Sequence, residues 1–263
     1  RGITAHPGLL ADMIRSFIEL GYEDMPGFHQ GDIFENNDPH YGGIHGPDFD
    51  TAMPIFYEDE LIAWASCVTH VSDSGSVTPG SVGFLNPDCY SDGVPISMEK
   101  VGENDAYYPW YDMRIRSRTR TPDFVLGDAK GRLAGCITMR ERLMDIIDKY
   151  GIDFFRDATH EFVEDSRRYA VGRVKTQTVP GRMRKSQFKD LAMKGKNIVL
   201  GKQDVDCLMA LPMELEIDGD ANINFSLRGA SGTVPFGENI HPTALKSGLL
   251  NGYSHVIGFD MFN

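Results

Sequence analysis

One stretch decides the fold: Ala52-Met-Pro-Ile-Phe-Tyr-Glu-Asp-Glu-Leu-Ile-Ala-Trp-Ala-Ser-Cys-Val-Thr-His70. An acidic turn, 58–60, separates two short apolar runs, 52–57 and 61–70, and this predicts a β-hairpin. If Tyr57 pairs with Leu61, counting back along both strands places His70 opposite Asp48. A turn shorter by one residue would place Pro47 there instead, and a bulge would shift the register. Because opposed Cβ atoms lie about 4.5–5.5 Å apart, the hairpin predicts that Asp48 and His70 are neighbours.

Acids and histidines gather just before this hairpin, in the Gly- and Pro-rich segment 37–48. We expect the chain to bend at Gly46-Pro47 and to bring His45 to Asp48 and His70, so that the three hold a metal ion. Two imidazoles and one carboxylate, without a thiolate, suit Mn(II) or Fe(II), with Zn(II) as a third choice. Three further residues near them are expected to orient the ligands: Asp38, His40 and Asp73. The alternative is that Asp and His residues in such turns only cap backbone groups.

The remaining segments predict an α+β fold, with mixed β-hairpins and sheets packed against helices. Helical spacing follows His6-Pro7 up to Gly21 and recurs over 122–150 and 154–168. Strict alternation over 213–217 and 223–227, around Asp218-Gly219, predicts a second hairpin. We expect two regions: 1–170, with the N-terminal helix, the hairpin, the central helix and the metal site, and 171–263, with a connector and the second hairpin. The basic stretch 185–202 is expected to be an exposed connector, and 229–237 a glycine-rich loop.

Four arginines alternate with other residues at 114, 116, 118 and 120. On a strand they would share one face, and we expect a row of ion pairs that answers the acidic excess; the alternative is that they receive an anionic substrate. His160, His241 and His255 stand alone in the sequence and receive no role.

Composition and missing motifs exclude several classes of protein. The 263 residues carry a formal net charge of −12, which disfavours binding to nucleic acids or acidic membranes. The longest apolar runs, such as Leu61–Ala65, are far shorter than the roughly 20 residues of a membrane-spanning helix. Phosphate-binding loops of the G-x-x-x-x-G-K-[ST] type, G-x-G-x-x-G and G-x-S-x-G are absent. The four cysteines form no C-x-x-C, and we expect reduced thiols in a cytoplasmic protein.

Several motifs in order resemble the hydantoinase B family: Gly31-Asp-Ile-Phe34, Asn37-Asp-Pro39 and His45-x-x-Asp48, then Pro54–Leu61, Val68-Thr-His70, Glu99–Gly102, Arg120-Thr-Pro122 and Ala134-Gly-Cys136. Within that family the chain is most similar to the alpha subunits of acetone carboxylases. These subunits are far longer than 263 residues. Together with an apolar end at Asn263 and a first residue Arg1, their length predicts that the chain is an internal segment of a larger hydantoinase B-like subunit.

The resemblance implies an ATP-dependent, manganese-containing ligase that joins acetone and bicarbonate to give acetoacetate. It implies that His45, Asp48 and His70 are the metal ligands. ATP and its Mg²⁺ would be bound by a hydantoinase A-like partner subunit, and a small third subunit would complete a cytoplasmic heteromer. We expect His40 or Asp73 to carry protons in the reaction.

Two alternatives follow from the same residues. The segment Asp38-Pro-His-Tyr-Gly-Gly43 is closer to the general hydantoinase B pattern than to that of acetone carboxylases. The substrate would then be another ketone, or a cyclic amide opened by a hydantoinase- or 5-oxoprolinase-type reaction. The second alternative is a noncatalytic scaffold with a structural metal.

Overall fold

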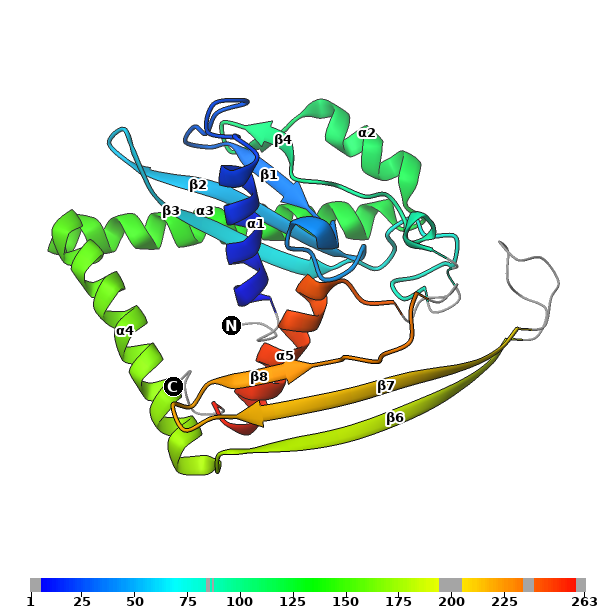
Figure 1. Ribbon diagram of the computed structural model, residues 1–263. Coiled ribbons are helices and arrows are strands. Elements are labelled where there is room, and N and C mark those ends of the chain that lie inside the picture. The colour runs from blue at the N-terminus through cyan, green and yellow to red at the C-terminus, as the bar shows by residue number, and fades with distance from the viewer. Residues whose placement is uncertain (1–5, 84–85, 87, 194–204, 234–238, 259–263) are drawn as a thin grey trace. The chain divides into compact units, whose positions relative to one another are not determined.

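The computed structural model describes all residues except 1–5, 84–85, 87, 194–204, 234–238 and 259–263 (Figure 1). By their internal contacts the residues form two compact units, Arg1–Phe155 with Ile240–Asn251, and Arg156–Asn239 with Gly252–Asn263. The described elements are helices and antiparallel strands, which confirms the α+β fold. The predicted regions, 1–170 and 171–263, were regions of a larger subunit. The two units describe contacts within this chain alone, so the division after residue 170 stays a prediction. No described helix is long and apolar enough to cross a membrane.

A five-stranded antiparallel sheet with the order β3-β2-β1-β4-β5 organises the first unit. Its bounds are β1 Ile33–Asn36, β2 Asp48–Tyr57, β3 Glu60–His70, β4 Glu99–Glu103 and β5 Ala106–Tyr107. The β2–β3 pair is the predicted hairpin, and it places Asp48 opposite His70 as predicted.

The route to this register differs from the prediction. Tyr57 pairs with Glu60, so the turn holds only Glu58 and Asp59, one residue fewer than predicted. Glu58 takes the left-handed conformation (φ 53°) that closes so short a turn. A bulge then leaves Ile62 unpaired on β3, because Phe56 pairs with Leu61 and Ile55 with Ala63. The extra residue compensates for the short turn, and the far end of the hairpin has the predicted partners.

The two faces of this sheet pack against different helices. Odd-numbered residues of β2, including Phe49, Met53 and Ile55, form a buried cluster with Val125, Ala129 and Cys136 of α3 (Pro122–Tyr150). On the other face, Ala52 and Phe34 pack against Met13 and Phe17 of α1 (Pro7–Glu19), where the Phe17 ring stacks on Trp64 at 5.4 Å between centroids. Figure 1 shows α1 and α3 on opposite sides of the sheet.

A buried ion pair crosses the interface between the sheet and α3. Arg132 of α3 and Glu35 of β1 have fully buried side chains, 2.7 Å apart. The guanidinium also donates to Thr51 Oγ1 of β2 (2.8 Å) and to Thr69 Oγ1 of β3 (2.6 Å). The Glu35 carboxylate accepts hydrogen bonds from the hydroxyl of Tyr111 at 2.9 and 2.8 Å. The network therefore ties three strands to α3 and to the helix that carries Tyr111, and Thr69 is the neighbour of His70.

The helices at 7–19 and 122–150 confirm their predictions, whereas α4 (Ile152–Gln177) is longer than the predicted 154–168. The prediction that the arginines share one face of a strand is wrong. Three of its positions fall in α2 (Pro109–Arg118), which begins at Pro109 because proline favours the first helical turn. Ion pairs hold three of the four arginines: Arg114 with Glu99, Arg116 with Asp112 and Asp123, and Arg120 with Asp73.

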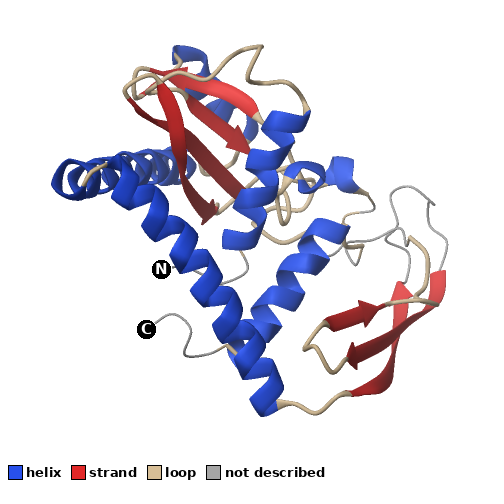
Figure 2. Ribbon diagram, turned by 60° about the vertical axis from the view of Figure 1, so that its left-hand side comes forward, coloured by secondary structure: helices blue, strands red, loops and turns tan. Residues whose placement is uncertain are grey.

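The second unit contains a three-stranded antiparallel sheet, β6 (Gly181–Met193), β7 (Val205–Ile217) and β8 (Ile223–Ser226), with β7 in the middle (Figure 2). The predicted hairpin is present, with Ile217 paired to Ile223. The predicted connector is a strand as far as Met193, and its remaining residues, 194–202, lie outside the described residues. Of the predicted loop, 229–233 is described as irregular chain and 234–238 is not described. The last helix, α5 (Pro242–Val256), begins in the first unit.

Candidate metal centre

The loop between β1 and β2 carries the candidate site, and Asn37 fixes its shape. The amide of Asn37 donates to the carbonyl oxygens of Gly46 (2.7 Å) and Val94 (3.1 Å) and accepts from the backbone of Ile96 (2.6 Å). Gly42 has a φ of 97°, and a Cβ there would lie 2.7 Å from the Met13 nitrogen of α1. Asn37 at the start of the loop is therefore hydrogen-bonded to Gly46 near its end, and the loop packs closely on α1 at Gly42.

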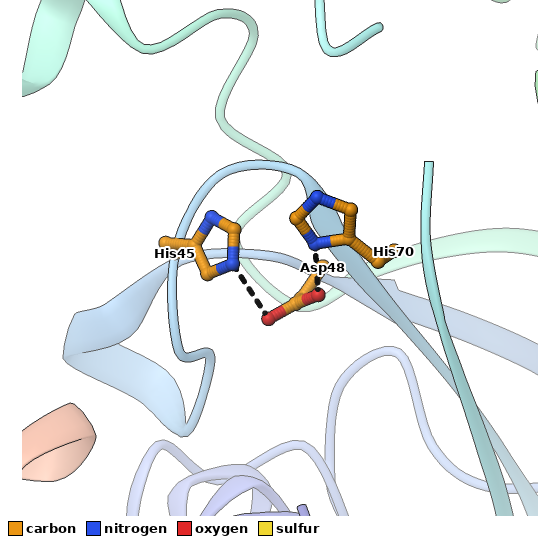
Figure 3. Close-up of side chains that lie close together, drawn as sticks. All are labelled: His45, Asp48 and His70. Carbon is orange, nitrogen blue, oxygen red and sulfur yellow. Dashed lines mark hydrogen bonds and ion pairs between the residues drawn. The ribbon is translucent and has the colours of Figure 1, made fainter. Parts of the chain in front are cut away.

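Three of the predicted residues meet at the open end of the hairpin (Figure 3). Asp48 is the first residue of β2, His70 is the last residue of β3, and His45 lies in the loop that leads into β2. One oxygen of the Asp48 carboxylate lies 3.0 Å from His45 Nε2 and the other lies 2.9 Å from His70 Nδ1. The three potential ligand atoms lie within 4.8 Å of one another. The Asp48 side chain is only 5% exposed, whereas the two imidazoles are 41% and 43% exposed.

The two histidines hold Asp48 in its ionised form. Burial opposes ionisation of this carboxyl, but hydrogen bonds from His45 and His70, with favourable charge from His45 and His6, outweigh it, so the pKa of Asp48 lies below its usual value. The carboxylate is buried, whereas both imidazoles are partly exposed. Together they supply one oxygen and two nitrogen atoms as possible metal ligands. This donor set fits a divalent cation of the Mn(II), Fe(II) or Zn(II) kind.

A buried carboxyl oxygen without a hydrogen-bond partner, on Asp50, supports this fit among the described residues. Asp50 lies two residues along β2 from Asp48, on the same face of the strand. Among the described residues no donor contacts its buried Oδ1 atom. Burial, and then the charge of Asp48, raise the pKa of Asp50 well above its usual value, against the attraction of Arg132. Negative charge is therefore unfavourable around Asp48 and Asp50, and a bound cation would offset it.

His6 is a neighbour of this site that the sequence analysis did not single out. Burial lowers its pKa; the Asp48 carboxylate raises it, and His45 and His70 lower it again. It precedes Pro7, the first residue of α1, and the only hint in the sequence was its position before a predicted helix.

Asp38 and His40 form a separate cluster in the same loop. Asp38 Oδ1 accepts hydrogen bonds from the backbone N–H and from Nδ1 of His40, both at 2.9 Å, and Oδ2 accepts from Ser97 Oγ at 2.7 Å. Although burial opposes ionisation, these bonds hold the pKa of Asp38 below its usual value. None of the described hydrogen bonds of Asp38 or His40 reaches the three metal-ligand candidates. The cluster instead includes His241, whose ring centroid lies 4.6 Å from that of His40.

The structure does not bring Asp73 to the candidate ligands through any described contact. Its buried carboxylate accepts hydrogen bonds from the backbone N–H (2.6 Å) and Nη1 (2.9 Å) of Arg120. This pairing gives Asp73 a structural role between two loops. A role for Asp73 in proton transfer or in orienting ligands stays a prediction, and its described contacts do not favour it.

Comparison with known proteins identifies the family. The family model described as Hydantoinase B/oxoprolinase matches residues 1–263. The acetone carboxylase alpha subunit of Xanthobacter autotrophicus is 32% identical over 250 residues, which cover 94% of this chain and 32% of the relative. The B-type subunit of a putative D-/L-hydantoinase from a Pseudomonas species is 32% identical over 160 residues, 60% of this chain and 27% of the relative.

Solved structures agree with this. A nucleotide-free acetone carboxylase matches 98% of this chain, and 34% of its own, with a TM-score of 0.92 and 30% identity. An ATP-dependent caprolactamase from Pseudomonas jessenii has the same fold, with a TM-score of 0.76 and 21% identity, over 96% of this chain and 41% of its own. The chain thus spans about a third of the acetone carboxylase subunit that it matches. It belongs to the hydantoinase B/oxoprolinase family.

Proposed function

We propose that this chain is the metal-holding catalytic segment of an ATP-dependent ketone carboxylase that converts acetone, bicarbonate and ATP to acetoacetate. The observation that carries the proposal is the convergence of His45, Asp48 and His70 at the end of the hairpin. The similarity to acetone carboxylase over nearly the whole chain supports the choice of reaction.

His45, Asp48 and His70 would hold the ion, and we propose Mn(II), with Fe(II) or Zn(II) as alternatives. When bound, the ion would supply Lewis-acid chemistry, which draws off the negative charge that develops on a substrate oxygen. The chain's own contribution is to fix the three ligands on a rigid hairpin. Asp48 contacts both imidazoles and thereby orients their rings before any ion binds.

His40 is the proton carrier in this proposal. Its Nδ1 donates to Asp38, so the other ring nitrogen, Nε2, has a lone pair free to accept a proton. The side chain of His40 is 68% exposed, so proton exchange with solvent needs no movement of the chain.

As the family resemblance implies, a hydantoinase A-like partner subunit would bind ATP and Mg²⁺, and a small third subunit would complete a cytoplasmic assembly. Several relatives are named as subunits, which supports an assembly of this kind. The test is substrate-dependent ATP hydrolysis by the purified native assembly. We expect acetone with bicarbonate to stimulate hydrolysis, and His45→Ala to abolish acetoacetate formation. Full activity of His45→Ala would overturn the proposal.

A second candidate function is ATP-dependent opening of a cyclic amide. It is favoured by relatives named as the beta chain of a caprolactamase and as a 5-oxoprolinase, and by the resemblance of 38–43 to the general family pattern. Stimulation of ATP hydrolysis by hydantoin or oxoproline, and not by ketones, would establish it. A structural metal in a noncatalytic scaffold is the third possibility, and it requires that chelation unfold the protein.

A further inference from the structure

His40 and His241 lie side by side although the loop and the start of α5 that carry them are far apart in the sequence. Their ring centroids are 4.6 Å apart and their planes are tilted by 54°. The described hydrogen bonds of each ring go to a different partner. These partners decide which ring nitrogen carries hydrogen, and so decide what each ring offers to a ligand.

Thr243 determines which ring nitrogen of His241 carries the hydrogen. The backbone N–H of Thr243 donates to His241 Nδ1 at 3.3 Å, and the Thr243 hydroxyl lies 3.0 Å from the same atom. Nδ1 is therefore an acceptor, and in the neutral ring the hydrogen resides on Nε2. Burial and the neighbouring His40 lower the pKa of His241, against the charge of Asp38, which favours this neutral form. His241 thus offers a hydrogen-bond donor, Nε2–H.

The polarity of His40 is the opposite. Its Nδ1 lies 2.9 Å from a carboxylate oxygen of Asp38, which can only accept, so Nδ1 carries the hydrogen. In the neutral ring Nε2 is then an acceptor. Ser97 holds the other oxygen of Asp38 and prevents the carboxylate from turning away. The two rings, whose centroids lie 4.6 Å apart, therefore offer one acceptor and one donor side by side.

We propose that His40 and His241 form a binding site for a planar group H–X–C=O, in which a carbonyl lies beside an acidic X–H. The X–H would donate to His40 Nε2 and the carbonyl oxygen would accept from His241 Nε2–H. Two sources share this chemistry: the HO–C=O of bicarbonate and the H–N–C=O of a cyclic amide, whose ring holds the two groups on the same side. The choice between these two ligands rests on the proposed function. The assignment of an acceptor to His40 and a donor to His241 does not.

The test measures binding to the purified native assembly after chelation of metal, so that an ion at His45, Asp48 and His70 takes no part. The probes are ¹³C-bicarbonate, hydantoin and 1,3-dimethylhydantoin, which keeps both carbonyls but lacks any N–H, and binding is followed by NMR line broadening. We expect saturable binding of bicarbonate or hydantoin and none of dimethylhydantoin. His241→Phe and His40→Phe, which keep a flat ring without its nitrogens, should each weaken binding at least tenfold.

His160→Phe is the matched control, because His160 is an exposed histidine on α4, and it should bind as the parent does. Circular dichroism checks that each variant is folded. Bicarbonate binding alone identifies the carboxylase ligand, and hydantoin binding alone identifies the cyclic amide; either supports the site. The proposal is overturned if neither probe binds, if both His→Phe variants bind normally, or if dimethylhydantoin binds as well as hydantoin. Loss of metal binding in His45→Ala would leave these results unchanged, so the two proposals fail separately.

Discussion

Replacing Arg132 by Met should destabilise the protein by more than any surface change. Met keeps much of the aliphatic length of the side chain, so the packing of α3 on the sheet is largely preserved. The guanidinium is lost, together with its bonds to Glu35, Thr51 and Thr69. Glu35, whose side chain is fully buried, is left as a carboxylate whose described partners are hydroxyl groups.

The magnitude follows from the burial of both partners. Removing one member of a buried pair costs about 3–5 kcal/mol, because an uncompensated charge stays behind. Adding Glu35→Gln removes that charge, and the double variant should recover about 1–3 kcal/mol relative to Arg132→Met, the usual coupling of contacting residues. Arg140→Met is the control on the same helix. Its pair with Asp105 is partly exposed, so about 0–1 kcal/mol is expected.

Urea unfolding followed by circular dichroism gives the free energies of unfolding for the parent, the three single variants and the double variant. The reasoning is refuted if Arg132→Met costs no more than Arg140→Met. It is also refuted if the two changes at 35 and 132 are additive, because the charge left on Glu35 would then not be the cause.

Two further substitutions test the buried carboxyl of Asp50 on β2 and the packing of Gly42 in the loop between β1 and β2. In metal-free protein at pH 8, Asp50→Asn should raise the free energy of unfolding by about 1–3 kcal/mol, since a buried carboxyl without a donor is removed. Because the pKa of Asp50 is raised in the folded state, the parent protein loses stability as the pH rises above the ordinary carboxyl pKa. The stabilisation by Asp50→Asn should therefore be smaller at pH 4 than at pH 8. Equal stabilisation at both pH values would contradict a raised pKa for Asp50. Gly42→Ala should cost about 1–3 kcal/mol in thermal unfolding, because φ is 97° and the Cβ would meet α1. Gly172→Ala in α4, where a Cβ meets nothing within 4 Å, should instead be neutral or stabilising, and similar effects at the two glycines would refute the role given to Gly42.

The hairpin shows both the strength and the limit of prediction from the sequence. Two apolar runs around an acidic turn were enough to identify the β2–β3 hairpin and to pair Asp48 with His70. The turn was nevertheless predicted one residue too long, and the bulge at Ile62 restored the register. A bulge depends on packing against other elements, and no local pattern announces it. The predicted pairing is correct because two local deviations compensate.

Contacts between distant segments could not be predicted. His241 stands alone in the sequence, and only the fold of the first unit brings it to His40. The arginines of 114–120 alternate as on a strand, but Pro109 starts a helix, and the acidic partners of Arg114 and Arg120 lie on other parts of the chain. The missing partner of Asp50 is likewise a property of the packed interior. Local periodicity sets the elements, and long-range packing decides which polar groups meet.

The measurement that tests the central claim most directly is pulsed electron paramagnetic resonance of the native assembly reconstituted with Mn(II). We predict tight binding, with magnetic coupling from two imidazole nitrogens, one of which disappears in His70→Ala and the other in His45→Ala. Asp48→Asn should weaken Mn(II) binding at least tenfold, because its carboxylate lies between the two rings. Tight binding without imidazole coupling, or an unchanged spectrum in both His→Ala variants, would contradict the proposed metal centre.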